Sequence, residues 1–436
     1  MLDKPVVVIG AGPAGLATLK ALRDRQVPAI GLDAGERPGG LWVLGGPDSS
    51  AYSTLHLNTS RTRTEFADFP MPAGWPDYPD HARIARYLAD YASGFDLLAA
   101  VRPGVRVTAV TPSAEGWAVT TAEGTVHTTP AVVVATGHNS IPRRPDPMYP
   151  GEFTGAMMHS HDYRDPAQLA GRRVLVVGGG NSAMDIAVDA SHTAARALLS
   201  LRRGVWVVPK YLLGRPSDTL NGALARRLPW RLRQRISERI LRTAVGPPQR
   251  YGLPAPAHGF LQDHPTLSDA LLPRITHGEL AVRPGIDRFD GGSVVFTDGH
   301  RDEVDLIVWC TGYRVELPFL PSVTDALPLY RRIFHLDSHG LFFVGLMQST
   351  GAAFPIVEAQ ARLVAAFLSG RYALPSPAEQ RADCERHLRR ARDRWGERRP
   401  AMRIDFDEYL AEAAAELEAG HRRARAGAQP GSVTWH

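Results

Sequence analysis

The pattern of apolar and polar residues predicts a strand–helix–strand unit at the start of the chain. Residues 5–9 form a continuous apolar run, rich in β-branched side chains, of the kind that a buried parallel strand needs. A glycine-rich turn follows, then residues 14–24 with helical periodicity, then a second predicted strand at 28–32 that is followed by Asp33. Such a unit is typical of the start of a doubly wound α/β sheet.

The same pattern returns in the middle of the chain. A predicted strand at residues 173–177 leads through a second glycine-rich turn to a helix at 182–190 and a strand at 197–201. The stretch 141–151 between the two units is rich in proline and glycine, which is typical of a linker. The fold class that we predict is therefore α/β, with two Rossmann-like dinucleotide-binding domains.

The first glycine turn fits the pattern G-x-G-x-x-G between a strand and a helix. Gly10 would allow the tight turn, Gly12 the close approach of a pyrophosphate, and Gly15 the packing of the helix on the strand. The free N–H groups at the start of the helix favour that anion, and Asp33 has the spacing of an acid that accepts from ribose hydroxyls. We assign this turn to FAD. Its residues are Gly10, Ala11, Gly12, Pro13, Ala14 and Gly15.

The second glycine turn fits G-x-G-x-x-A, but here the following strand leads to Arg202 and Arg203 instead of a carboxylate. A carboxylate would repel the 2′-phosphate of NADP, whereas guanidinium groups bind it through charge-assisted hydrogen bonds. We therefore predict an NADPH site; the alternative is that the two arginines are merely solvated in a surface loop. The residues of this turn are Gly178, Gly179, Gly180, Asn181, Ser182 and Ala183.

The order of the predicted elements places the second nucleotide-binding domain inside the first. Strand signals return after the second unit, and the chain ends in predicted helices. We expect a discontinuous FAD-binding domain at residues 1–165 and 303–436. We expect the NADPH-binding domain at residues 166–302, with an insertion around 215–264 that is irregular and contains several prolines.

The composition excludes several other classes of protein. With 44% hydrophobic and 22% charged residues the chain is ordinary for a globular protein, and no stretch approaches the roughly 18 apolar residues of a membrane span. The net charge of +5 is spread over scattered arginines without an aromatic-interleaved basic stripe, so we predict no nucleic-acid partner. Cys310 and Cys384 form no redox-active pair, which argues against a disulfide reductase. We expect a cytoplasmic protein without a transmembrane segment.

The segment between the two units carries a specific pattern. Phe153, Gly155, His159 and Tyr163 give the spacing F-x-G-x-x-x-H-x-x-x-Y. This pattern resembles the fingerprint of the flavin-containing monooxygenase family, one of the class B flavoprotein monooxygenases; the related Baeyer–Villiger enzymes usually carry Trp where this chain has Tyr163. His159 and His161 also form an H-x-H pair, but no further ligand lies near them in the sequence, so we predict no metal site.

The resemblance extends over nearly the whole chain. Residues 38–42 are similar to the flavin-side loop of the family, and residues 57–60 are similar to the segment that bears its active-site Asn. The run 310–313 also matches, although Cys310 stands where the family usually has Ala. On this basis the predicted cofactor-binding residues also include Gly40, Leu41, Trp42, His159, Thr311, Gly312 and Gln348.

The resemblance implies a mechanism. In the family, NADPH reduces the flavin, and the reduced flavin adds O₂ to form a C4a-hydroperoxide that is attacked by a soft nitrogen or sulfur atom of a small-molecule substrate. The resemblance places Asn58 beside the flavin as the catalytic residue; the alternative is an Asn that only caps a turn. Baeyer–Villiger oxygenation of a ketone stays open, as does a flavin reductase or oxidase that makes no oxygenated product.

Residues 226–242 in the insertion predict a basic amphipathic helix. Leu228, Leu232, Ile236 and Ile240 recur every four residues, and we expect arginines on the opposite face. Because insertions often carry specificity, we expect this helix to form a lid or wall over the substrate site, and we do not expect peripheral contact with a membrane. The substrate and the oligomeric state, a homodimer included, stay open.

Overall fold

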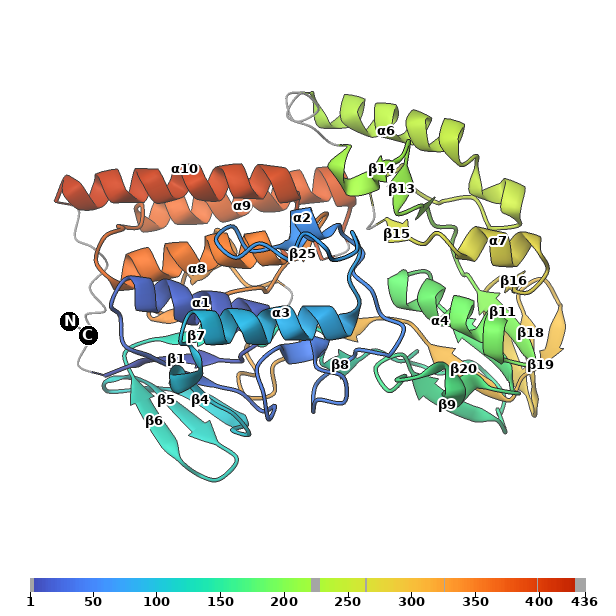
Figure 1. Ribbon diagram of the computed structural model, residues 1–436, viewed down its shortest axis with the longest axis horizontal. Coiled ribbons are helices and arrows are strands. Elements are labelled where there is room, and N and C mark those ends of the chain that lie inside the picture. Colours follow the sequence, from blue (N-terminus) through green and yellow to red (C-terminus); the bar gives the residue numbers. More distant parts are fainter. Residues whose placement is uncertain (1–3, 221–227, 263–264, 325, 398, 428–436) are drawn as a thin grey trace. The chain divides into compact units, whose positions relative to one another are not determined.

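Two compact units make up the chain (Figure 1). The computed structural model describes residues 4–220, 228–262, 265–324, 326–397 and 399–427. Unit 1 is discontinuous, and unit 2 is inserted into it. Unit 1 comprises Met1–Ser49, Arg61–His138 and Val315–His436, and unit 2 comprises Ser50–Ser60 and Asn139–Arg314.

Unit 1 is built on a seven-stranded sheet of order β22-β23-β24-β7-β1-β2-β3. The five strands from β24 to β3 run parallel, and β22 and β23 extend the sheet in antiparallel orientation. Every residue of β1 is buried, which explains its uninterrupted apolar sequence. The strands are β1 Val6–Ile9, β2 Ala29–Leu32, β3 Val101–Arg102, β7 Val132–Val134, β22 Leu329–Tyr330, β23 Phe334–His335 and β24 Leu341–Phe343.

Helices and a second sheet cover the two sides of this sheet. Helices α1 and α8 lie side by side above β1 and β7 in Figure 1, and an antiparallel sheet of β4, β5 and β6 lies below them. The helix α1 begins with Pro13, inside the first glycine turn and one residue before the predicted start at residue 14. The bounds are α1 Pro13–Asp24, α2 Arg61–Thr64, α3 His81–Gly94, α8 Phe354–Leu368, β4 Val107–Ser113, β5 Gly116–Thr121 and β6 Val126–Thr129.

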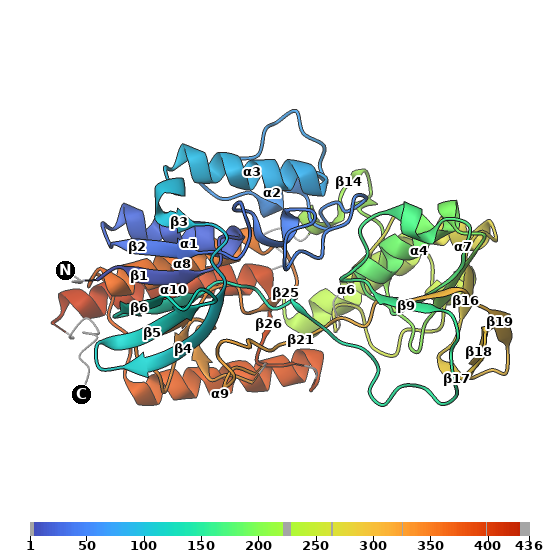
Figure 2. The same cartoon turned by 90° about the horizontal axis from the view of Figure 1, so that it is seen from below.

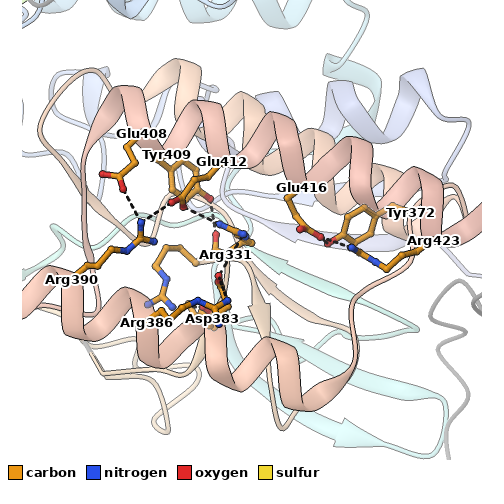
Figure 3. Close-up of polar contacts among 12 residues, drawn as sticks. Arg331, Tyr372, Asp383, Arg386, Arg390, Glu408, Tyr409, Glu412, Glu416 and Arg423 are labelled. Carbon is orange, nitrogen blue, oxygen red and sulfur yellow. Dashed lines mark hydrogen bonds and ion pairs between the residues drawn. The ribbon is translucent and has the colours of Figure 1, made fainter. Parts of the chain in front are cut away.

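Ion pairs connect the C-terminal helices α9 (Pro377–Trp395) and α10 (Phe406–Arg425). Figure 3 shows Arg331, in the turn between β22 and β23, reaching Asp383 of α9 at 3.5 Å and Glu412 of α10 at 2.9 Å. Arg390 of α9 also pairs with Glu412, at 3.0 Å. A groove of about 820 Å³ lies between these charged residues. Its lining consists mainly of arginines and carboxylates, several of which pair across it, so we attribute the groove to helix packing and not to binding of an apolar substrate.

Unit 2 contains a second parallel sheet, of order β16-β11-β10-β20-β9. Helix α4 follows β10 after the second glycine turn, and a three-stranded antiparallel sheet of β17, β18 and β19 completes the unit (Figure 2). The bounds are β9 Ala156–His159, β10 Arg173–Val177, β11 Arg196–Ser200, β16 Ala281–Arg283, β20 Leu306–Trp309, α4 Asn181–Thr193, α7 Leu271–Thr276, β17 Ile286–Asp290, β18 Ser293–Phe296 and β19 Arg301–Glu303.

The predicted α/β fold class, with two parallel sheets, is confirmed. The boundaries between the two units, however, differ from the predicted domain boundaries. The two main boundaries lie after residues 138 and 314, where we expected 165 and 302, and the segment 50–60, which we expected in the FAD-binding domain, belongs to unit 2. Both shifts have one cause. Strands β9 and β20 pair with each other, and β20 pairs with β10, so all three belong to the sheet of unit 2. The assignment of the units to FAD and NADPH stays a prediction.

Short strand pairs and the insertion helix α6 complete the described structure. Helix α6 spans Trp230–Ala244, later than the expected 226–242, because Pro229 directly precedes its first residue; residues 226 and 227 lie outside the described part. Among the described residues, no helix is long and apolar enough to cross a membrane. The pairs are β8 Ile141–Pro142 with β21 Tyr313–Arg314, β12 Val207–Val208 with β15 Thr266–Leu267, β13 Tyr211–Leu212 with β14 Arg215–Pro216, and β25 Gln348–Ser349 with β26 Arg403–Ile404.

Candidate cofactor and catalytic sites

Close packing of the backbone explains two glycines of the first turn. Gly10 has φ +101°, and a Cβ atom there would lie 2.8 Å from the carbonyl oxygen of Ala135. A Cβ atom at Gly15 would lie 1.8 Å from the carbonyl oxygen of Gly10. Both contacts are with backbone atoms, which no side-chain rotation can move away. The turn therefore needs glycine at these positions for the strand and the helix to approach each other.

The helix that follows this turn has an N-terminus without a side-chain cap. Gly12 is its N-cap residue and Pro13 its first residue, and no side chain accepts from the first-turn N–H groups. By contrast, the side chain of Asp80 caps α3 by accepting from the backbone N–H of Arg83 at 2.8 Å. The start of α1 therefore offers donors and the positive end of its dipole to an anion, which fits the pyrophosphate of a dinucleotide.

The acid predicted for the ribose lies directly against the first turn. One oxygen of Asp33 accepts from the backbone N–H of Ala11, and the other accepts from that of Gly35 at 2.7 Å. Burial raises the pKa of this carboxyl, although the two backbone donors act in the opposite direction. A carboxylate has about four lone-pair sites, so Asp33 keeps acceptor capacity for a ribose hydroxyl.

The loop predicted to lie on the flavin side packs on the same turn. The backbone N–H of Gly39 donates to the carbonyl oxygen of Ala11 at 2.9 Å. A Cβ atom at Gly40 would lie 2.9 Å from Cα of Gly12. The short helix Gly40–Trp42 starts at this contact, so the structure brings its three predicted residues next to the first glycine turn.

Gln348 lies in β25 of the same unit. Its backbone N–H donates to the carbonyl oxygen of Met402 at 2.8 Å, and its side chain is half-buried. The preceding turn approaches α1, because a Cβ atom at Gly345 would lie 3.2 Å from Cβ of Ala14. The structure thus brings the segment before Gln348, rather than Gln348 itself, to the start of α1.

The second glycine turn repeats these features in unit 2. Gly178 has φ +142°, and a Cβ atom there would lie 2.3 Å from the carbonyl oxygen of Cys310. Gly180 is the N-cap of α4, which also has no side-chain cap, and a Cβ atom at Gly180 would meet nothing within 4 Å. Ser182 and Ala183 form the first turn of this helix. The space at Gly180 and the uncapped N–H groups fit a second pyrophosphate.

Asn181 at the start of α4 binds the protein's own backbone. Its side-chain oxygen accepts from the backbone N–H of Leu267 at 2.9 Å. The hydroxyl of Thr266 donates to the carbonyl oxygen of Gly179 at 2.9 Å. Together these bonds hold β15 against the glycine turn, so the polar group of Asn181 fixes the shape of the predicted site.

Arg202 and Arg203 follow β11, and both are exposed. Within the described residues neither guanidinium group has a hydrogen-bond or ion-pair partner. The Arg202 stem lies near Gly285, where an added Cβ atom would be 3.7 Å from Cγ of Arg202. Lys210, a further candidate for the same phosphate, is partly buried, which lowers the pKa of its amine, whereas the charge of Asp185 raises it. The two arginines therefore supply unneutralised positive charge after the strand where the sequence predicts a phosphate.

The fingerprint at residues 153–163 lies inside unit 2, and packing within that unit explains several of its residues. Gly155 is needed because an added Cβ atom would lie 2.5 Å from the Phe153 ring and 2.8 Å from the carbonyl oxygen of Asp305. The Phe153 ring in turn packs on Phe289 with 5.5 Å between ring centroids. These contacts fix the start of β9 against the sheet.

His159, the central residue of the fingerprint, is fully buried, and both of its ring nitrogens are used. Nδ1 accepts from the backbone N–H of His161 at 3.0 Å, so Nε2 carries the proton and donates to the carbonyl oxygen of Gly312 at 3.1 Å. Burial lowers the pKa of His159 to about 4, which keeps the ring neutral. Thr311 donates its hydroxyl to the carbonyl oxygen of Arg143. The ring of His159 therefore positions the turn at 311–312 and has no nitrogen left for a cofactor.

Two carboxylates of α4, Asp185 and Asp189, bind the segment 50–60 through hydrogen bonds. The sequence analysis did not single them out. The hydroxyl of Tyr52 donates to Asp185 at 2.6 Å. Thr54 and Tyr163 both donate to Asp189, at 2.7 and 2.8 Å. Tyr163, the last residue of the fingerprint, thus binds the same helix, α4. Two acids one turn apart within the apolar stretch 183–190 were the signal in the sequence that could have revealed this attachment.

Asn58, the predicted catalytic residue, lies in this fastened segment. Its side chain is half-buried and has no hydrogen-bond partner among the described residues. Two residues later, the backbone N–H and the hydroxyl of Ser60 both donate to Asp218, at 2.7 and 3.0 Å. The segment is therefore held on both sides of Asn58, while the amide itself stays available for a ligand.

We expect Tyr52→Phe to destabilise the protein by about 1.5–3 kcal/mol, because it removes a hydrogen bond to a charged group. Burial raises the pKa of Asp185 to about 6, and the Tyr52 hydroxyl acts against this rise. Without that donor, ionised Asp185 is less stable in the fold, so the loss should be larger above pH 6 than below the usual carboxyl pKa. Urea unfolding at both pH values measures this difference. Tyr149→Phe is the control. An equal loss of unfolding free energy at both pH values would contradict the assignment of ionised Asp185 as the partner of Tyr52.

Comparisons with known proteins identify the family to which this chain is similar. A family model described as flavin-binding monooxygenase-like matches residues 3–422. Flavin-containing monooxygenase 5 of Homo sapiens is 31% identical over 441 residues, which cover 95% of this chain and 83% of that protein. The N-oxide-forming dimethylaniline monooxygenase 2 of Mus musculus is 34% identical over 453 residues, which cover 96% of this chain and 83% of that protein.

Solved structures show the same fold. The S-allyl-L-cysteine S-oxygenase from Allium sativum has a TM-score of 0.71 at 24% identity, covering 100% of this chain and 96% of that one. A steroid monooxygenase bound to NADP has a TM-score of 0.71 at 19% identity, covering 98% of both chains. The open form of cyclohexanone monooxygenase also reaches 0.71 at 19% identity, covering 96% of this chain and 98% of that one. The family match and the curated relatives show that this chain belongs to the flavin-binding monooxygenase-like family and is a flavin-dependent monooxygenase.

Proposed function

We propose that this protein is an FAD- and NADPH-dependent oxygenase that transfers one oxygen atom to a soft nitrogen or sulfur atom of a small molecule. One observation carries the proposal: the two units each contain a glycine turn before an uncapped helix, and the next strand is followed by an acid in the first unit but by two arginines in the second. Asp33 beside the first turn suits a ribose, and Arg202 and Arg203 after the second suit a 2′-phosphate.

The proposed reaction consumes NADPH, a proton, O₂ and the substrate, and yields NADP⁺, water and the oxygenated substrate. When bound, FAD accepts a hydride from NADPH and activates O₂, so no side chain has to act as a nucleophile. The residues of this chain then have other tasks. The turn at Gly10–Gly15 binds the flavin pyrophosphate, Gly178–Ala183 bind that of NADPH, and the surrounding protein excludes water from the reaction.

Asn58 is the residue that we assign to the reaction itself. A neutral amide can donate a hydrogen bond to a reacting oxygen or to the nicotinamide carboxamide without introducing a charge. The side chain of Asn58 has this donor available, and its neighbours Tyr52, Thr54 and Ser60 fix the backbone around it. A fixed backbone with an available polar group is what positioning of a small reactant requires.

We expect Asn58→Ala to retain FAD and to be reduced by NADPH, but to release hydrogen peroxide instead of oxygenated product. The expected loss of coupling is about 10²-fold, as for removal of a single preorganised donor. The measurement is the ratio of product to NADPH consumed, with peroxide measured in parallel. Asn139→Ala, at an exposed Asn, is the control. Unchanged coupling in Asn58→Ala would remove the residue from the mechanism.

The choice of nitrogen or sulfur rests on one sequence relative and on one enzyme of the same fold. The mouse relative that is 34% identical is named for the formation of an N-oxide, and the garlic enzyme with the same fold is an S-oxygenase. Baeyer–Villiger oxygenation is the second candidate, because cyclohexanone monooxygenase shares the fold. A panel of a tertiary amine, a thioether and a cyclic ketone, each with NADPH and O₂, distinguishes them. We expect N-oxide or sulfoxide, and a lactone as the main product would favour the second candidate.

A further inference from the structure

The solvent-facing side of α6 carries an apolar stripe. Leu232, Ile236 and Ile240 are exposed by 45%, 42% and 42% of their surface. Their spacing of four residues places them along one side of the helix. From the sequence we expected the helix that carries these residues to form a lid or wall over the substrate site. The structure instead leaves a row of three large aliphatic side chains in contact with water.

A stripe of positive charge runs beside the apolar one. Arg231, Arg235 and Arg239 each precede an apolar residue by one position, which rotates them by roughly 100° around the helix. They therefore lie next to the apolar stripe, and not opposite to it as the sequence had suggested. All three are exposed, and within the described part of the chain none of their guanidinium groups has an ion-pair partner.

The opposite side of α6 explains why these stripes face outward. Leu241 is 2% exposed and packs in a cluster with Trp206 and Phe260 of the same unit. The side-chain amide of Gln234 donates to the carbonyl oxygen of Phe260 at 2.8 Å, and the backbone N–H of Phe260 donates to Glu238 at 3.3 Å. These contacts fix the rotation of the helix about its axis, so its exposed side is a defined surface of unit 2.

We propose that this side of α6 is a docking surface for a lipid bilayer that contains anionic lipids. A helix with this pattern lies in the plane of the interface, with its aliphatic side chains at the boundary of headgroups and acyl chains. The arginines then lie at the depth of the lipid phosphates and carboxylates, to which their charge is complementary.

Charge argues for lipid over a second copy of this chain. If two α6 surfaces packed on each other in antiparallel orientation, the two rows of arginines would lie on the same side of the contact, and like charges oppose such a contact. An anionic bilayer offers both an apolar layer and negative charge to the same surface. The attachment would be peripheral, and it is independent of the oxygenation chemistry proposed above.

Sedimentation with vesicles tests the proposal on the full flavin-loaded protein. The vesicles are phosphatidylcholine alone, or phosphatidylcholine partly replaced by phosphatidylserine. We expect binding to the second kind, weaker binding at high salt, and little binding to the first kind. Replacing the aliphatic stripe in the variant Leu232→Ser/Ile236→Ser/Ile240→Ser should lower the partition coefficient at least about tenfold, as should replacing the basic stripe in Arg231→Gln/Arg235→Gln/Arg239→Gln.

A matched control separates this surface from the general basicity of the chain. The variant Arg381→Gln/Arg386→Gln/Arg389→Gln removes three exposed arginines of α9 and should bind vesicles like the wild type. Flavin content reports that each variant folds. Absence of wild-type binding to phosphatidylserine vesicles would overturn the proposal, as would equal loss in the α9 control. It would also be overturned if the aliphatic variant changed only the oligomeric state, measured by analytical ultracentrifugation, since the surface would then join two copies.

Discussion

Purified Gly15→Ala protein is expected to contain less than about a tenth of the wild-type flavin and to be less stable by at least about 1–3 kcal/mol. The new Cβ atom would lie 1.8 Å from the carbonyl oxygen and 2.7 Å from the carbonyl carbon of Gly10. Both atoms belong to the backbone of the turn itself. The clash can therefore be relieved only if α1 moves away from β1, and that movement displaces the N–H groups that we assign to the pyrophosphate of FAD.

Two measurements check this result. Flavin content follows from the absorbance ratio of the purified protein, and stability follows from urea unfolding. Gly74→Ala is the matched control, because a Cβ atom at that glycine would meet nothing within 4 Å in the same unit. A Gly15→Ala protein with full flavin content would show that the first turn is not the FAD site, whatever its stability.

The double variant Arg202→Ala/Arg203→Ala is expected to lose its preference for NADPH over NADH. One charge-assisted hydrogen bond contributes about 1.5–3 kcal/mol, so the KM for NADPH should rise between roughly 10-fold and 100-fold. The KM for NADH should change little, because NADH has no 2′-phosphate for the arginines to bind. Stability should also change little, because both side chains are exposed and neither has a partner in the described part of the protein.

Steady-state kinetics with both nucleotides measure this change in preference. Arg288→Ala, at an arginine in the same unit that is 55% exposed and pairs with Asp287, controls for loss of general positive charge. If the KM values for NADPH and NADH rose by the same factor, the arginines would contact a part common to both nucleotides, and recognition of the 2′-phosphate would have to be assigned elsewhere.

Local features of the sequence were sufficient to predict the two strand–turn–helix units to which we assign the nucleotides. A glycine turn, the strand before it and the helix after it lie within about thirty residues, as is usual for such units, so their contacts follow from chain order. Gly10, Gly15 and Gly178 proved to be required by backbone contacts, and Asp33 lies against the first turn. The glycine-turn pattern was informative because the glycines are needed for close backbone packing and Asp33 accepts a hydrogen bond from the turn.

Contacts between distant segments could not be predicted in the same way. Tyr52 and Asp185 are 133 residues apart, and only the fold shows that one donates to the other. The boundary at residue 138 was missed because β9 is short and only its last residue, His159, is fully buried, so it lacks the pattern of a buried strand. Helix α6 shows a third limit. The four-residue spacing predicts that Leu232, Ile236 and Ile240 share a side of the helix. It does not indicate whether other parts of the protein cover that side.

Isotope labelling of the product tests the central assignment most directly. The flavin-loaded protein is supplied with NADPH and ¹⁸O₂ in unlabelled water, together with the tertiary amine or thioether that is turned over in the substrate panel. A monooxygenase of the proposed kind incorporates one ¹⁸O atom into each product molecule, and it consumes one NADPH for each product formed. Product oxygen derived from water, or NADPH oxidation that yields only hydrogen peroxide with every substrate, would contradict the account.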